Sequence, residues 1–331
     1  MSRRALGRWL LVWMVIGALV ACNAPVGDRG AGVELEPSAT SIAPTATADP
    51  VSATGIPTIT AVPTEVSKTE SSADPPSEGL TAESLAELTS RQVSLPFTYV
   101  AIGDTQDKNP KDTSASEIFA MLIRQINELQ PDFVIHLGDV SDRGTAFELN
   151  RFESLIAELD APIVTVAGNH DTKSHRELFS SRYVSTNSST GFMDYSFDYG
   201  GVRFVVVDNS EYYLSSEQLE WLDVQLQTDG CKIVSMHCPP DYGRWKDSGG
   251  MYSPEGFMKL MKSHEVDLVY CGHFHLHSLM QVAGTRYVIS GCGGGTLSSR
   301  DMGVKQHGFD LVTVGVEGIE TEFVPLTVRM K

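Results

Sequence analysis

The stretch FVIHLGDVSD, residues 133–142, changes character in its middle, where apolar and β-branched residues give way to a glycine and two aspartates. The apolar half is typical of a strand buried on both faces, which places Asp139 and Asp142 just beyond the end of that strand. Four other stretches repeat the arrangement: GDTQ at 103–106, GNHD at 168–171, MHCPP at 236–240 and GHFH at 272–275. The chain therefore predicts several buried strands, each followed by polar side chains.

Side chains at strand ends can meet although they lie far apart in the sequence. In open α/β sheets the carboxyl ends of the strands border one crevice, where ligands bind. Asp, Asn and His carry the oxygen and nitrogen donors that divalent first-row metals accept. Helical patterns fall between the strands, at 116–130, 146–159, 216–227 and 254–264, and two hairpins are predicted at 195–208 and 277–290. These features predict an α/β domain with a metal site at a sheet edge.

In this order, the five stretches resemble the signature of the calcineurin-like metallophosphoesterase superfamily, written D-x-H, GDxxD, GNH[DE], H and GHxH. The resemblance covers roughly residues 95–326, and four of the five stretches match. It implies a four-layer α/β/β/α sandwich with two divalent metal ions, manganese, zinc or iron, at the carboxyl edge of the sheet. The implied reaction is hydrolysis of a small phosphate monoester or diester by metal-bound hydroxide.

The resemblance also implies roles for individual residues. Asp139 would bridge the two metals, because a shared carboxylate holds two cations about 3.5–4 Å apart. The first metal would also bind Asp104 and His275, and the second would bind Asn169, His237 and His273. His170 resembles the proton donor to the leaving group, with Asp142 orienting its ring. Arg143 is either a clamp for the substrate phosphate or a surface salt-bridge former.

One position departs from the signature, since Gln106 stands where the superfamily usually has histidine. Glutamine can bind a metal only through a neutral amide oxygen, a poorer donor than imidazole for zinc or iron. Three outcomes are open: an active dinuclear centre with Gln106 as a ligand, a mononuclear or weakly loaded first site, or a metal- or ligand-binding lipoprotein that kept the fold and lost the chemistry.

The first 22 residues combine arginines at positions 3, 4 and 8 with the apolar run WLLVWMVIGALV and end in Leu-Val-Ala-Cys. This pattern predicts a secretory signal peptide, because the apolar run is too short for a comfortable membrane span. The ending resembles a bacterial lipobox, in which Cys22 is acylated after cleavage; an uncleaved anchor is the alternative. We therefore expect an extracytoplasmic lipoprotein of a bacterial cell envelope, held at the membrane by its lipid.

Residues 23–80 are rich in Thr, Ala, Ser and Pro and contain no aromatic residue. Such a segment cannot bury enough apolar surface to offset its ordering entropy, so we expect a disordered linker. A catalytic domain is expected at 92–327, preceded by a short helix that Thr81 would cap. The net charge of −17 argues against nucleic acid as a partner, because neutralising phosphates supplies most of that affinity.

Several residues outside the signature carry narrower predictions. Cysteines 231, 238, 271 and 292 are expected to be buried thiols, with one disulfide near the site as the alternative. His136 is expected in the core and His264 in solvent, while His175, His277 and His307 are candidates to reach the pocket. The run GCGGG at 291–295 resembles a segment that approaches the metals closely; otherwise it is a flexible loop. The stretch 241–252, with Tyr242, Trp245 and Tyr252, is either a substrate-recognising loop that stacks on a nucleobase or sugar, or a packed surface loop.

Overall fold

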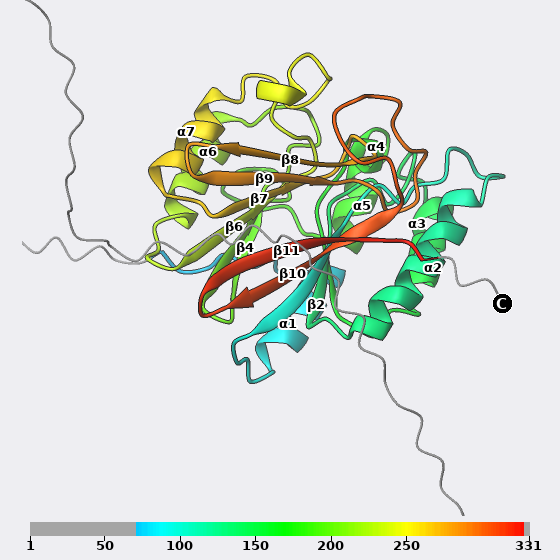
Figure 1. Ribbon diagram of the computed structural model, residues 1–331, viewed down its shortest axis with the longest axis horizontal. Helices are drawn as coiled ribbons and strands as arrows, with labels where there is room; N and C mark the ends of the chain where they lie inside the picture. Colours follow the sequence, from blue (N-terminus) through cyan, green and yellow to red (C-terminus); the bar gives the residue numbers. More distant parts are fainter. Residues whose placement is uncertain (1–70, 328–331) are drawn as a thin grey trace, which may run out of the picture. The chain divides into compact units, whose positions relative to one another are not determined.

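The computed structural model describes residues 71–327 (Figure 1). The predicted signal peptide, with Cys22, and most of the predicted linker lie outside the described residues. Among the helices of residues 71–327, none combines the length and the apolar composition that a membrane span requires.

Two mixed sheets form the centre of the domain. The first has the order β11-β10-β1-β2-β3, with bounds Gly318–Pro325, Gly308–Gly315, Phe97–Ile102, Phe133–His136 and Ile163–Thr165. The second has the order β4-β5-β6-β7-β9-β8, with bounds Tyr195–Tyr199, Val202–Val206, Cys231–Ser235, Leu268–Cys271, Thr285–Ser290 and His277–Val282. The neighbours β1, β2 and β3 are parallel, as are β5, β6, β7 and β9. The carboxyl ends of each parallel group therefore lie at one edge of its sheet.

Helices cover the outer faces of the two sheets (Figure 1). On the first sheet, α2 (Ser114–Leu129) and α3 (Ala146–Ile156) pack through Phe119 and Phe152, whose rings stack with centroids 5.8 Å apart and both contact His136 of β2. On the second sheet, α6 (Ser216–Gln225) and α7 (Glu255–Ser263) join the same apolar cluster as strand residues such as Val205 and Val234. The remaining helices are α1 (Leu80–Thr89), α4 (Asn169–Thr172), α5 (Arg176–Arg182) and the 3-10 turn η1 (Gly243–Trp245).

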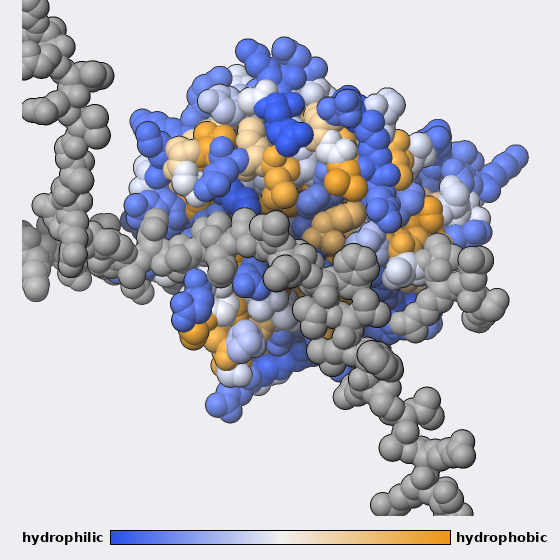
Figure 2. All heavy atoms as spheres, in the orientation of Figure 1, coloured by the Kyte–Doolittle hydropathy of each residue, from blue (hydrophilic) through white to orange (hydrophobic). Residues whose placement is uncertain are grey.

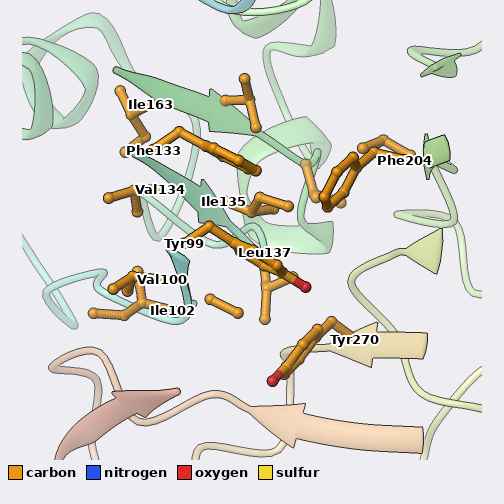
Figure 3. Close-up of a cluster of buried hydrophobic side chains, with 14 of the residues drawn as sticks. Tyr99, Val100, Ile102, Phe133, Val134, Ile135, Leu137, Ile163, Phe204 and Tyr270 are labelled. Atoms are coloured by element: carbon orange, nitrogen blue, oxygen red, sulfur yellow. The ribbon is translucent and has the colours of Figure 1, made fainter. Parts of the chain in front are cut away.

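The inner faces of the sheets pack against each other. Phe204 of the second sheet contacts Tyr99 and Phe133 of the first, in both cases with ring centroids 5.5 Å apart (Figure 3). Because side chains alternate along a strand, Phe204 faces this inner core while its neighbour Val205 faces α6 and α7. The central strands are thus buried on both faces, as their continuous apolar runs predicted. The expected four-layer α/β/β/α sandwich is confirmed.

The four predicted crossover helices and both hairpins are present, with ends shifted by a few residues. The role expected of Thr81 is wrong: Gly79 precedes α1, and the buried Thr81 hydroxyl lies 3.1 Å from the hydroxyl of Thr165. The antiparallel pair β10–β11 was not predicted; β10 pairs with β1 and extends the first sheet.

The domain includes residues on the linker side of the expected boundary. Asp74 accepts hydrogen bonds from the Trp221 indole at 2.9 Å and the Asn187 amide at 2.8 Å, and its backbone N–H donates to the Ser196 hydroxyl at 2.7 Å. Residues 71–80 fall within the predicted linker because that prediction rests on composition, which is rich in Thr, Ala, Ser and Pro and lacks aromatic residues. They are held by polar contacts instead, which composition does not reveal.

The surface seen in Figure 2 is largely hydrophilic where it is described, with apolar residues in small groups. Large apolar side chains are concentrated in the layers between the sheets and helices.

Candidate metal centre

The structure brings the predicted ligands together at the carboxyl ends of five strands. The first sheet contributes oxygen donors: Asp104 follows β1, Asp139 follows β2 and Asn169 follows β3. The second sheet contributes imidazoles: His237 follows β6, and His273 and His275 follow β7. Ligand atoms of Asp104, Asp139 and His237 all lie within 4.8 Å of one another.

The donors form two groups that share Asp139. In one group, the Oδ1 atom of Asn169 lies 3.0 Å from Nε2 of His237 and 3.0 Å from Nδ1 of His273, and His237 Nε2 lies 3.3 Å from Asp139 Oδ2. In the other, His275 Nε2 lies 3.3 Å from Asp104 Oδ1, and Gln106 Nε2 lies 3.2 Å from Asp139 Oδ2. This is the arrangement expected of a bridging carboxylate between two neighbouring sites.

Backbone carbonyls orient each of the three imidazole rings. His237 Nδ1 lies 2.7 Å from the Leu137 carbonyl, His273 Nε2 lies 3.0 Å from that of Gly249, and His275 Nδ1 lies 2.8 Å from that of Thr296. A neutral imidazole that donates its single N–H outward turns the lone pair of its other nitrogen inward. The inward ring nitrogens and the carboxylate oxygens therefore converge, a donor set that fits divalent cations of the zinc, manganese and iron type.

Four of the predicted ligand residues have the left-handed backbone that non-glycine residues rarely adopt. The φ angles are 62° for Asp104, 57° for Asp139, 72° for His273 and 44° for His275. Such strain clusters at functional sites and persists where the surroundings enforce it.

Glycines let these backbones approach closely. A Cβ atom at Gly138 would lie 2.7 Å from Nδ1 of His237, and one at Gly291 would lie 2.6 Å from Oδ2 of Asp104. Residues 291–295 are all buried. The prediction that this run packs closely against the site is confirmed, and the flexible-loop alternative is wrong.

Burial and neighbouring charges shift the pKa values of Asp139, His237 and His273. Burial favours the neutral form of Asp139, but the neighbouring His237 charge outweighs it and lowers the pKa of this carboxyl. Burial likewise disfavours charge on His237, but Asp139 outweighs it and raises the pKa of this ring to about 10. Burial and the charge of His237 lower the pKa of His273 to about 4. The centre thus attracts positive charge while His273 stays neutral, the form that can bind a metal.

Gln106 lies beside the centre. Its Nε2 atom is 3.2 Å from Asp139 Oδ2 and 3.4 Å from His275 Nε2, whereas its Oε1 atom is buried without a hydrogen-bond partner. A half-turn of the amide exchanges these two atoms and points the oxygen at the same neighbours. The position therefore suits a ligand, and ligation by Gln106 stays a prediction.

The predicted catalytic residues adjoin the Asp139 carboxylate. The backbone N–H of His170 donates to Asp139 Oδ1 at 2.9 Å, and the ring is partly exposed. Its Nδ1 atom lies 2.9 Å from the Asp142 carbonyl and 3.2 Å from the Asp142 carboxylate, so both groups of Asp142 orient the ring. Arg143 is 63% exposed and its Nε atom lies 3.3 Å from the Asp142 carboxylate, and its role as a clamp for the substrate phosphate stays a prediction.

Two supporting residues were missed by the sequence reasoning. The Asp171 carboxylate accepts hydrogen bonds from the N–H groups of Asp139, Ser141 and Gly168, and so holds the loop that carries Asp139. The Oδ1 atom of Asn209 accepts from the N–H groups of His237 and Cys238 at 3.1 and 2.9 Å. A signal was available, because Asn209 also follows an apolar run that ends in polar residues.

The other histidines lie outside the donor groups. His136 is a core residue as predicted, with Nε2 3.0 Å from the Thr105 hydroxyl. His264, expected in solvent, lies 2.6 Å from Asp223 and is partly buried. The three candidates to reach the pocket have other partners or face solvent. His277 lies 3.2 Å from Asp310 and stacks on Phe323, and His307 lies 3.2 Å from the Cys292 carbonyl. His175 is exposed.

The thiols of Cys238, Cys271 and Cys292 are free and buried, as predicted. The prediction of a buried free thiol is wrong for Cys231, which is partly buried and is not among the free cysteines. In the loop at 241–252, Trp245 is fully buried and donates to the Ser278 hydroxyl. Its proposed stacking on substrate is therefore wrong, whereas Tyr242 and Tyr252 are exposed.

Comparison with known proteins agrees with this geometry. The sequence model of the family "Calcineurin-like phosphoesterase" matches residues 97–277, more than half of the chain. The chain therefore belongs to this family and is a phosphoesterase.

Similar proteins include bacterial phosphodiesterases. The chain is 25% identical over 251 residues to the "Probable cyclic nucleotide phosphodiesterase" of Rhodococcus erythropolis, covering 69% of this chain and 80% of that protein. It is 25% identical over 212 residues to a 3′,5′-cyclic-nucleotide phosphodiesterase of Nostoc sp., covering 59% and 77%. The fold resembles purple acid phosphatase from yellow lupin, Lupinus luteus, with a TM-score of 0.58 and 18% identity over 72% of this chain and 53% of that one.

The contacts of Asn209 generate a prediction. Asn209→Ala should weaken metal binding or turnover about 10- to 100-fold, the usual effect of losing a group that orients a ligand, because His237 loses its backbone support. Bound metal would be measured after dialysis against graded metal concentrations. Ser210→Ala, whose hydroxyl bonds Asp208, is the control and should bind metal normally. Unchanged metal affinity in Asn209→Ala would show that Asn209 does not position the ligand.

Proposed function

We propose that this phosphoesterase hydrolyses cyclic nucleotides at a dinuclear metal centre. The observation that carries the dinuclear part is the sharing of Asp139 between two donor groups. The diester preference is supported by the names of the similar proteins from Rhodococcus and Nostoc.

Each side chain has a part in this proposal. Asp104, His275 and Gln106 would hold one cation; Asn169, His237 and His273 would hold the other; Asp139 would join them. Two divalent cations supply charge that binds phosphoryl oxygens and lowers the pKa of water. His170, oriented by Asp142, would donate a proton to the ribose oxygen as its bond to phosphorus breaks. The buried glycine-rich backbone at 291–295 excludes water behind Asp104.

A second candidate is a metal- or ligand-binding lipoprotein with weakened catalysis. Gln106 offers the first site only a neutral amide oxygen, a poorer donor than the usual imidazole, which favours a poorly loaded first site. Activity measured after the protein is loaded with metal distinguishes the phosphodiesterase from the binding lipoprotein.

Removal and replacement of metal tests the proposed reaction. The protein treated with a chelator should lose hydrolysis of 3′,5′-cyclic AMP and regain it with manganese, zinc or iron, as followed by release of 5′-AMP. Asp139→Asn should stay inactive with every metal, because the shared carboxylate is weakened. A folded, refilled protein that cleaves p-nitrophenyl phosphate but no cyclic nucleotide would contradict the diester assignment; inactivity on all substrates would favour the binding protein.

The role of His170 predicts a specific loss. His170→Ala should lower kcat about 10²- to 10⁴-fold, the usual effect of a general acid, without lowering metal content. The loss should be smaller for bis(p-nitrophenyl) phosphate, whose leaving group needs little protonation. His175→Ala, which removes an exposed histidine nearby in the chain, should behave as wild type. Loss of metal from the His170 variant would assign His170 to metal binding instead.

We also propose that Cys22 carries the lipid that holds this enzyme at the outer side of a bacterial membrane. The support is the Leu-Val-Ala-Cys ending of the apolar run. Cys22→Ala should release the protein from the membrane fraction or leave its signal peptide uncleaved, as measured by fractionation and mass spectrometry. Unchanged acylation would rule out this residue.

A further inference from the structure

Two tyrosines form a stack that runs outward from the candidate metal centre. The ring of Tyr212 lies edge-on to the ring of His273, with centroids 5.4 Å apart. The ring of Tyr252 stacks on Tyr212, with centroids 5.9 Å apart and 29° between the planes. Tyr252 is 60% exposed. The stack therefore starts at a predicted metal ligand and ends in an aromatic side chain open to solvent.

Backbone hydrogen bonds hold both tyrosines beside the centre. The N–H of Tyr252 donates to the Tyr212 carbonyl at 2.7 Å, and the N–H of Tyr212 donates to the Asn209 carbonyl at 2.8 Å. Asn209 in turn holds the backbone of His237. The loop that carries Tyr252 also supplies the Gly249 carbonyl that orients His273. The stack and the metal ligands thus share one rigid support.

The backbone of Tyr212 is strained, with φ at 65°. A bulky aromatic residue in this left-handed region is an outlier, and such strain is typical of ligand sites. The strain puts the Tyr212 ring between His273 and Tyr252, where it supports an exposed ring that has little packing of its own.

We propose that Tyr252, backed by Tyr212, stacks on the nucleobase of a nucleotide whose phosphate lies at the metal centre. The inference rests on the proposed function and identifies what would recognise the base. Every nucleobase has a π face, and stacking on an aromatic side chain tolerates any base. Cyclic nucleotides with different bases should therefore be accepted alike, and a phosphate ester without a planar group gains nothing from Tyr252.

A pair of competitive inhibitors isolates the contribution of the base. 5′-AMP and ribose 5-phosphate differ only by adenine, and both can be measured against hydrolysis of bis(p-nitrophenyl) phosphate by the metal-loaded protein. Tyr252→Ala should raise the inhibition constant of 5′-AMP about tenfold and leave that of ribose 5-phosphate unchanged. Tyr252→Phe should behave as wild type, because the ring is kept. Tyr242→Ala, which removes an exposed tyrosine of the same loop outside the stack, is the matched control.

The possible results separate the two proposals. An unchanged constant for 5′-AMP in Tyr252→Ala, or an equal rise for both inhibitors, would overturn base stacking. A wild-type protein that cleaves bis(p-nitrophenyl) phosphate but not cyclic AMP would overturn the cyclic-nucleotide assignment. Base stacking can still be judged if cyclic AMP is not cleaved. If the wild-type protein then binds 5′-AMP no more tightly than ribose 5-phosphate, base stacking is overturned as well. If it prefers 5′-AMP and Tyr252→Ala removes this preference, base stacking is upheld.

Discussion

The carboxylate of Asp139 is buried, with 1% of the residue exposed, so its surroundings have to compensate its charge. A buried charge is costly unless it is paired or binds a metal. His237 and Gln106 both approach its Oδ2 atom, and the His170 N–H donates to its Oδ1 atom. Oxygen donors come from the first sheet and imidazoles from the second. The centre therefore exists only when the two sheets pack face to face, which the contacts of Phe204 with Tyr99 and Phe133 secure.

Bringing the predicted ligands to one edge of the sandwich imposes demands on the backbone. Left-handed conformations at Asp104, Asp139, His273 and His275 turn the chain sharply after β1, β2 and β7. Close approaches require glycine, as at Gly138 and Gly291. These costs are local, whereas the packing that offsets them is spread through the core. This division explains how a rigid sandwich can hold a strained centre at its edge.

Sequence reasoning succeeded where the pattern is local or repeated. The apolar runs predicted β1, β2, β3, β6 and β7, and the polar residues after them predicted the ligand cluster. It failed where a distant contact decides the outcome. Thr81 faces Thr165 instead of capping α1, Trp245 is buried by contact with Ser278, and Asp74 is fixed by Trp221. None of these partners is near in the sequence, so no local pattern could reveal them.

The amino-acid sequence alone determined the family, the layer architecture that this resemblance implied, and the identity of the ligand candidates, because buried apolar runs and the polar residues after them are encoded within short segments. Tertiary structure alone decided which groups share Asp139, which carbonyl orients each imidazole, and that Tyr212 and Tyr252 stack beside His273. The physical reason is distance along the chain: these contacts join segments from different strands and loops, and their geometry arises only when the two sheets close on each other.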